Sequence, residues 1–242
     1  MFGLFNKKQS FKNPLTVDIH SHLIPAVDDG SKSVEESIAI LREFQQLGYT
    51  KVITTPHIMK EYFDNDIHSI QPQYELLMQK INEENLDIKL EFAAEYQLDE
   101  FFFDKVNKGE ELLTFGDGHI LIETSFFNAP VFLKDVFFSL KTKGYSPIFA
   151  HPERYMYLIQ NFQLARELKN MQVLFQINAP SLIGYYGKAV KKLAEKLLEN
   201  DMVEFVGSDC HNLGHIESMK KTIESKAFQN LPFDKLLNNT LK

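Results

Sequence analysis

Histidine and acidic residues recur at the ends of short apolar runs along this chain of 242 residues. Five of the eight histidines and four acidic residues occupy such places. They are His20, His22, Asp29, His57, Glu95, Glu123, His151, Asp209 and His211. Imidazole nitrogens and carboxylate oxygens suit Mn²⁺, Fe or Zn²⁺ better than a structural zinc site rich in thiolates. The set is too large for one ion, so it predicts two or three ions bridged by carboxylates.

Two of these motifs require the backbone to bend. In LTVDIHSH, His20 and His22 would point to opposite faces of a regular strand. They can reach one ion only if the strand ends there, which the following loop over residues 23–29 permits. The last apolar run ends in the same way, with Asp209 and His211 separated by one residue. We therefore expect both motifs to mark strand ends.

The remaining histidines are expected to be loop or packing residues. These are His68, His119 and His215. His119 stands at the start of the run HILIE, so it should lie at the opposite rim from Glu123.

Strand-like and helix-like segments alternate along the chain. The predicted strands are VDIH, KVITTPH, IKLEFAAEY, HILIETS, SPIFAHP, VLFQINAP and VEFVGSDCH. Helices are expected over about 33–47, 69–84, 99–113, 131–143, 155–170, 188–199 and 216–226. The first has Ser33 and Glu36 at capping-box spacing and Gly48 as its stop signal.

Seven βα units indicate either a parallel barrel or a doubly wound open sheet. Only a closed barrel gathers functional residues from all its strand ends into one ring. We therefore predict an α/β fold, a distorted (β/α)7 barrel, with the metal site at the C-terminal ends of the strands. The expected organisation is a single domain over residues 15–242 after an N-terminal extension of residues 1–14.

Composition narrows the class of protein. The net charge of −7 argues against generic nucleic-acid binding, which needs a basic surface. The single cysteine, Cys210, cannot form an intrachain disulfide. The first residues lack the apolar core of a secretory signal, and no window approaches the ~20 apolar residues of a membrane span. We expect a cytoplasmic protein without membrane insertion.

The order DIHSHLIPAVDDGSKSVEES, TPH, AAE, LIE, AHPERY and SDCHN resembles the PHP (polymerase and histidinol phosphatase) superfamily. Within it, the chain is most similar to the bacterial tyrosine-phosphatase branch, the CpsB/YwqE-like enzymes of capsule and exopolysaccharide systems. The likeness runs from about Val17 to the last helix, and the combination of DIHSH, VDDG and AHPERY is specific for the branch. It implies a PHP-type barrel and metal-dependent hydrolysis of phosphotyrosine on a bacterial tyrosine kinase.

The resemblance also implies roles for individual residues. All nine residues named at the outset would bind metal, with Mn²⁺ as the expected ion and Fe, Zn²⁺ or Mg²⁺ as alternatives. Our interpretation of the sharing is that one ion binds to His20, His22 and Asp209, a second to Glu95 as bridge with Glu123 and His151, and a third to Asp29, His57 and His211. Arg154 would bind the phosphate. The leaving phenolate would be protonated by a metal-bound water or by His211, and the sequence does not choose.

A cysteine mechanism is disfavoured at this point, and two alternatives stay open. Cys210 as a nucleophile would need an arginine six residues later, where the chain has Ile216, so we expect a buried, inert thiol. The enzyme could instead be a small-molecule phosphomonoesterase such as a histidinol-phosphate phosphatase. The other alternative is a non-catalytic metal-binding scaffold that regulates a polysaccharide kinase. For a tyrosine phosphatase, Phe126 or Tyr155 is expected to contact the substrate.

Overall fold

Parallel β-sheets form the centre of the protein, whose computed structural model describes residues 12–242. Within these residues the strands form one sheet of order β1-β2-β4 and another of order β3-β5-β6-β7-β8-β9. The strands are β1 (Val17–Asp18), β2 (Lys51–Thr54), β3 (His57–Ile58), β4 (Lys89–Phe92), β5 (Glu95–Gln97), β6 (His119–Glu123), β7 (Ser146–Ala150), β8 (Leu174–Asn178) and β9 (Phe205–Gly207). The predicted α/β class with parallel strands is confirmed.

Two of the expected strands are interrupted, and each runs from one sheet into the other. KVITTPH forms β2 and β3, separated at Pro56, and IKLEFAAEY forms β4 and β5. Backbone hydrogen bonds continue across both gaps: the amide of Ala93 donates to Thr54 O at 2.9 Å, and that of Glu95 to Pro56 O at 3.1 Å. The two sheets are therefore joined along this side.

The first and last strands also lie side by side. Ser21 and Cys210, just beyond β1 and β9, form a parallel bridge. Next to it the amide of Asp209 donates to His20 O at 2.8 Å, and the amide of His22 donates to Cys210 O at 2.9 Å. This contact brings the His-x-His and Asp-x-His motifs together.

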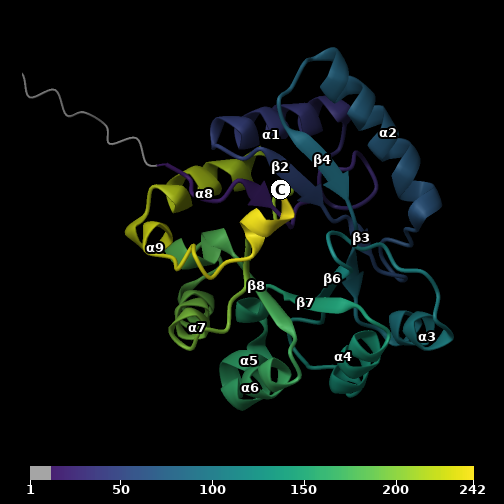
Figure 1. Ribbon diagram of the computed structural model, residues 1–242, viewed down its shortest axis with the longest axis vertical. Coiled ribbons are helices and arrows are strands. Elements are labelled where there is room, and N and C mark those ends of the chain that lie inside the picture. Colours follow the sequence, from purple (N-terminus) through teal and green to yellow (C-terminus); the bar gives the residue numbers. More distant parts are fainter. Residues whose placement is uncertain (1–11) are drawn as a thin grey trace, which may run out of the picture.

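Helices surround the strands on the outside, as Figure 1 shows. They are α1 (Val34–Gln46), α2 (Ile67–Glu83), α3 (Glu100–Lys108), α4 (Leu133–Thr142), α5 (Met156–Gln160), α6 (Phe162–Asn170), α7 (Lys188–Glu199), α8 (Leu213–Ile223) and α9 (Lys226–Gln229), with short 3₁₀ turns η1 (Pro152–Arg154), η2 (Ala179–Ile183) and η3 (Asn238–Leu241). The helix expected over 155–170 is divided at Asn161, and the one expected over 216–226 begins earlier and is divided into α8 and α9.

The cap predicted for the first helix is formed in part. The side chain of Ser33 accepts a hydrogen bond from the amide of Glu36 at 3.2 Å. The carboxylate of Glu36 accepts from the amide of Lys32 at 2.9 Å, one residue before the position that a capping box requires. Gly48 follows the helix end at φ 91°, a left-handed conformation that favours glycine.

Apolar side chains fill the space between the strands as well as the space under the helices. The inner cluster contains Val17, Ile53, Leu121, Ile148 and Phe205, which come from strands of both sheets. Burying each of these side chains contributes about 1.5–3 kcal/mol. The strands thus enclose a packed core, and the polar residues at their C-terminal ends have a rigid base.

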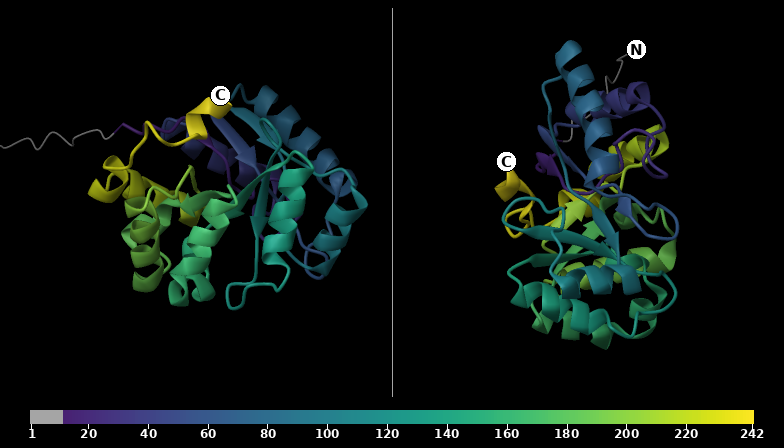
Figure 2. Two further views of the ribbon diagram at one scale, coloured as in Figure 1. Left: turned by 60° about the horizontal axis from the view of Figure 1, so that its bottom comes forward. Right: turned by 90° about the vertical axis from the view of Figure 1, so that its right-hand side faces the viewer.

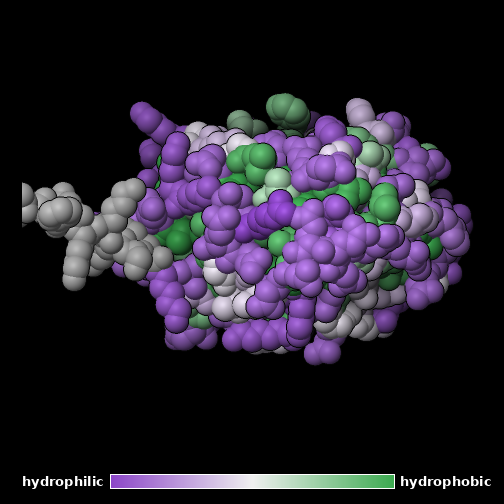
Figure 3. All heavy atoms as spheres, turned by 90° about the horizontal axis from the view of Figure 1, so that it is seen from above, coloured by the Kyte–Doolittle hydropathy of each residue, from purple (hydrophilic) through white to green (hydrophobic). Residues whose placement is uncertain are grey.

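No helix formed by residues 12–242 is long and apolar enough to cross a membrane. Figure 2 shows the helices packed along the outside of the strands from two further sides, and the face in Figure 3 is mostly hydrophilic with small apolar patches. Residues 1–11, most of the expected N-terminal extension, lie outside the described part of the chain.

Candidate metal centre

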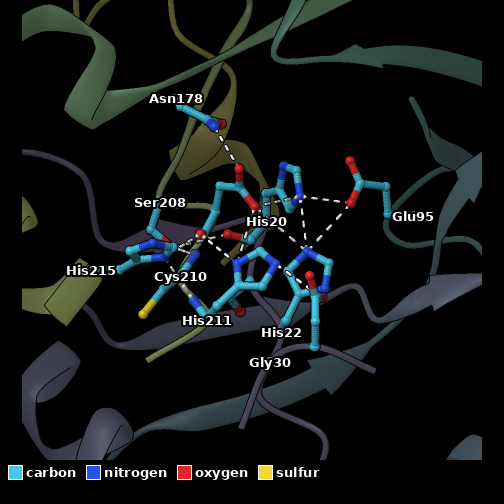
Figure 4. A network of polar contacts seen from close by, with 12 residues as sticks. His20, His22, Gly30, Glu95, Asn178, Ser208, Cys210, His211 and His215 are labelled. Atoms are coloured by element: carbon cyan, nitrogen blue, oxygen red, sulfur yellow. Dashed lines mark hydrogen bonds and ion pairs between the residues drawn. The ribbon is translucent and has the colours of Figure 1, made fainter. Parts of the chain in front are cut away.

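All nine residues predicted from the sequence converge at the C-terminal ends of the strands. Their nitrogen and oxygen atoms form overlapping groups in which the atoms lie within 4.8 Å of one another. The groups are His22–Asp29–His57–His211, His20–His22–Glu95, His20–His151–Asp209 and His57–Glu95–Glu123. Figure 4 shows His20, His22 and Glu95 pointing toward one another, with His211 beside His22.

The backbone bends where the sequence requires it to. The Nε2 atoms of His20 and His22 lie 3.3 Å apart, although alternate residues of a regular strand would face apart. His151 and Asp209 adopt positive φ angles of 33° and 51°, a strained conformation for residues with side chains. At Gly30 an added Cβ would lie 2.1 Å from His22 O, so only glycine lets the loop approach this closely. Strand-end strain and close packing therefore aim these ligands inward.

Glu95 lies at the middle of the cluster. Its Oε2 atom is 3.2 Å from His20 Nε2 and 3.4 Å from His22 Nε2, and its Oε1 atom is 3.1 Å from His151 Nε2. His151 Nε2 also lies 3.9 Å from Glu123 Oε2. One carboxylate thus faces imidazoles on both of its sides, which is the arrangement of a bridging ligand.

Two further sets flank Glu95. Asp209 Oδ1 lies 3.4 Å from His20 Nε2 and 3.6 Å from His22 Nε2. On the more exposed side, Asp29 Oδ1 lies 3.5 Å from His57 Nε2 and 3.3 Å from His211 Nε2. These spacings allow three neighbouring sites to share the cluster.

Three residues that the sequence analysis missed hold the ligands in place. Asp28 Oδ2 is 2.7 Å from His22 Nδ1, and it accepts the amide of His57 at 3.0 Å. On β8, Gln176 Oε1 is 2.8 Å from His20 Nδ1, and the side-chain Nδ2 of Asn178 donates to Asp209 Oδ2 at 2.7 Å. A hydrogen bond at Nδ1 fixes the tautomer, so that Nε2 presents its lone pair to an ion. In the sequence, the signals for these three residues were the second acid in VDDG and the two amide side chains within an otherwise apolar strand.

Arg154 reaches the cluster from η1. Its Nη1 atom donates to Asp209 Oδ2 at 2.8 Å, and its guanidinium lies 4.5 Å from the ring centre of Phe126 and 4.6 Å from that of Tyr186. Together with seven of the nine predicted ligands, all but the buried His20 and His22, these side chains line a cavity of about 460 Å³. Tyr155 is fully buried, so of the two aromatics expected to meet a substrate only Phe126 can do so.

Of the three histidines expected to be loop or packing residues, two are as predicted and one is not. His68 is exposed in α2, and His119 stacks on Phe115 at the opposite end of β6, as expected. His215 is different, because it lines the cavity and its Nδ1 accepts the amide of His211 at 3.1 Å. Cys210 is buried, and burial raises the pKa of its thiol well above the usual value, so it is a poor nucleophile.

Charges in the cluster balance one another through the imidazoles. Burial disfavours a charged His20, yet the carboxylates of Glu95 and Asp209 outweigh it and raise its pKa to about 10. His57 behaves likewise: burial opposes its charge, but Glu123 and Glu95 raise its pKa to about 10. Burial would favour protonation of Glu95, but His20 and its other histidine neighbours hold its pKa well below the usual value. The pocket therefore concentrates carboxylate charge that needs cations close by.

The donor set fits divalent ions. Four buried side-chain atoms of the cluster make no hydrogen bond within residues 12–242, namely His57 Nδ1, Glu95 Oε2, Glu123 Oε1 and His151 Nδ1. Leaving such atoms unsatisfied is costly unless they bind something. Buried imidazole and carboxylate atoms in this number and spacing are the ligands that Mn²⁺, Fe or Zn²⁺ use.

Comparisons with known proteins agree with this geometry. The chain is 35% identical over 205 residues to the tyrosine-protein phosphatase CpsB of Streptococcus pneumoniae, covering 81% of this chain and 83% of that one. A solved structure from a study of YwqE from Bacillus subtilis and CpsB from Streptococcus pneumoniae, described as metal-dependent tyrosine phosphatases, superposes with a TM-score of 0.79 at 29% identity, covering 92% of this chain and 94% of its own.

A more distant likeness concerns the fold alone. The histidinol phosphate phosphatase of Lactococcus lactis superposes with a TM-score of 0.53 at 14% identity, covering 88% of this chain and 93% of that one. The family model described as "Capsular polysaccharide synthesis, CpsB/CapC" matches residues 16–232. The chain therefore belongs to the CpsB/CapC family.

Proposed function

We propose that this protein is a metal-dependent phosphatase that hydrolyses phosphotyrosine on a protein. The observation that carries the proposal is the convergence of nine candidate ligands in one cluster, seven of which line a cavity with Arg154, in a chain whose relatives are named tyrosine-protein phosphatases. The proposed substrate is a bacterial tyrosine kinase of capsule or exopolysaccharide synthesis, met in the cytoplasm.

The proposed ligand sharing follows the contacts. His20, His22 and Asp209 would hold one ion, Glu95 would bridge to a second with Glu123 and His151, and Asp29, His57 and His211 would hold a third. Mn²⁺ is the proposed ion, because the donors are oxygen and imidazole nitrogen. When bound, such ions lower the pKa of water and so supply hydroxide near neutral pH.

The chain's own groups would position the phosphate and the ring. Arg154 presents a planar fork that can bind two phosphoryl oxygens and balance their charge. Its stack between Phe126 and Tyr186 keeps the guanidinium at the cavity wall. Phe126 would also lie against the tyrosine ring of the substrate. Asn178, which holds Asp209 Oδ2 with Arg154, would keep that carboxylate in place when Arg154 turns to the phosphate.

His211 has two candidate roles, metal ligand and proton donor to the leaving group. Its Nε2 atom cannot serve both at the same time. Its Nε2 faces Asp29 at 3.3 Å and its Nδ1 faces the backbone oxygen of Asp209 at 2.9 Å. With an ion bound at Nε2 and the Nδ1 proton donated to the Asp209 carbonyl, the ring would have no proton to give to the leaving phenolate. We therefore propose His211 as a ligand during catalysis rather than as the proton donor.

We also infer that the two sheets form the distorted (β/α)7 barrel of a single domain over residues 15–242. Counting β2 with β3 and β4 with β5 as one strand each gives seven, and β1 meets β9 through Ser21 and Cys210. The inner apolar cluster shared by both sheets supports the same inference.

The test compares three substrates with and without Mn²⁺. Purified protein should hydrolyse p-nitrophenyl phosphate and a phosphotyrosine peptide, lose this activity in chelator, and regain it with Mn²⁺. Cys210→Ser should keep the activity, because the thiol is buried away from the cavity. Faster turnover of histidinol phosphate than of phosphotyrosine would favour the small-molecule alternative, and metal binding without any hydrolysis would favour a regulatory scaffold.

A further inference from the structure

A second groove opens directly beside the metal cavity. It has a volume of about 450 Å³ and lies between the segments that follow β3, β5 and β6. Met59, Glu123 and Phe126 line both spaces. A chain held by its phosphate at the metal cavity would therefore have this groove as its immediate neighbour on that side.

The polar lining of the groove is acidic. Glu61, Asp99 and Glu100 contribute carboxylates, and among the described residues the lining includes no lysine or arginine. The three charges act on one another: burial raises the pKa of Asp99, and the charges of Glu100 and Glu61 raise it further. A cation placed between them would relieve this repulsion.

Aromatic rings project at the same place. Tyr62, Phe101 and Phe127 line the groove with 76%, 55% and 74% of their surfaces exposed. Lone exposed rings are common, but three at one groove form an apolar patch that a partner can cover. Ring faces also attract lysine and arginine side chains. Acidic and aromatic groups in one groove thus select for a basic segment.

We propose that this groove binds the polypeptide segment next to the phosphotyrosine and selects segments that carry lysine or arginine. The inference rests on the proposed function, since the phosphotyrosine must first be held at the metal cavity. The lining residues that the two spaces share indicate where the segment would lie. The carboxylates of the groove indicate that the segment would be positively charged.

The experiment uses the full chain with Mn²⁺ and a set of phosphotyrosine peptides of equal length. Their flanking positions, within about four residues on each side, carry lysine, alanine or glutamate. Free phosphotyrosine, which is too short to enter the groove, is the reference substrate. We expect the KM to be roughly 3- to 30-fold lower for the lysine peptides than for the glutamate peptides, the effect of two exposed ion pairs. The preference should shrink as salt is added.

Reversing the charge of two groove residues tests whether the preference for lysine peptides arises in the groove. The double variant Glu61→Lys with Glu100→Lys should invert the ratio of the lysine to the glutamate peptides, measured against its own rate on free phosphotyrosine. The matched control, Glu75→Lys with Glu199→Lys, changes the net charge equally at exposed sites on α2 and α7 and should keep the wild-type ratio.

The outcomes separate the two proposals. Hydrolysis of free phosphotyrosine without any peptide preference, or an equal response of both double variants, would overturn the groove proposal and leave the proposed function standing. No hydrolysis of free phosphotyrosine or of any peptide would end both. A changed oligomeric mass in the groove variant alone, with unchanged peptide selectivity, would assign the groove to contact between copies of this chain.

Discussion

Individual ligands in this cluster depend on neighbours that bind no ion themselves. Asp28 is the clearest case, because one carboxylate orients both His22 and the backbone of His57. Gly30 completes the turn by donating its amide to Asp28 Oδ1 at 2.9 Å. The two acidic residues in VDDG therefore have different roles. Asp29 faces the cavity, whereas Asp28 faces His22 and the backbone of His57. The resemblance named Asp29, but nothing in the sequence of two identical residues indicates that Asp28 would orient His22 and His57.

Replacing Asp28 by asparagine should weaken metal binding. The amide keeps the volume but presents an N–H group or a weaker acceptor to His22, so the imidazole loses its orientation. We expect Mn²⁺ affinity to fall about 10- to 100-fold, with activity restored at high Mn²⁺. Titration calorimetry measures the affinity. Asp64→Asn, at an exposed ion pair with Lys60, is the control and should bind Mn²⁺ like the wild type. An unchanged Mn²⁺ affinity in Asp28→Asn would show that Asp28 does not orient His22 for metal binding.

At the scale of elements, the strands must approach one another closely where the ligands leave them. Gly207, at the end of β9, lies where an added Cβ would come 2.8 Å from both His20 Cβ and Gln176 Nε2. Neither atom is the free end of a long side chain, since Gln176 is itself hydrogen-bonded to His20. A side chain at this position would therefore push on the pair that fixes one metal ligand.

Gly207→Ala should reduce activity more than stability. Displacing His20 by a few tenths of an ångström misplaces an ion, and catalysis is sensitive to such shifts, so we expect kcat/KM to fall roughly 100-fold. Activity per folded, Mn²⁺-loaded molecule is the measurement. Gly144→Ala is the comparison: its φ of 89° strains an alanine, but nothing lies within 4 Å of the new methyl group. It should lose stability and keep its activity, and equal activity losses in both variants would contradict the argument.

Over the whole molecule, the sequence predicted the alternation of strands and helices and the gathering of strand ends, but not the details of how distant strands pair. The convergence of the nine candidate ligands was predictable because eight of them end an apolar run and Asp29 follows in the loop after the first. Gln176 and Asn178 were missed because they lie inside β8, where their partners belong to other strands. The gaps in KVITTPH and IKLEFAAEY also escaped prediction, since the pairing of one strand with two sheets depends on neighbours far away in the sequence.

The C-terminal turn η3 joins the first and last strands at the end opposite the metals. Asn238 donates to Val17 O at 3.0 Å and to Val206 O at 2.8 Å, and it accepts the amide of Val206 at 3.0 Å. Asn238→Ala leaves these buried groups unpaired, so we expect it to lower the free energy of unfolding by about 3 kcal/mol. Urea denaturation tests this. Thr240→Ala, exposed in the same turn, should change it by less than about 0.5 kcal/mol.

Lys51 donates its ammonium group to the backbone oxygen of Leu241 at 2.7 Å, and the side chain of Leu241 packs into the inner cluster. Residues 238–241 thus cover the end of the core that the first described strands begin. While the chain is being synthesised, β1 is made long before its neighbour β9 and before the residues of η3 that pack on the inner cluster. The inner cluster therefore stays uncovered until η3 is made, well after the last candidate ligand, His211.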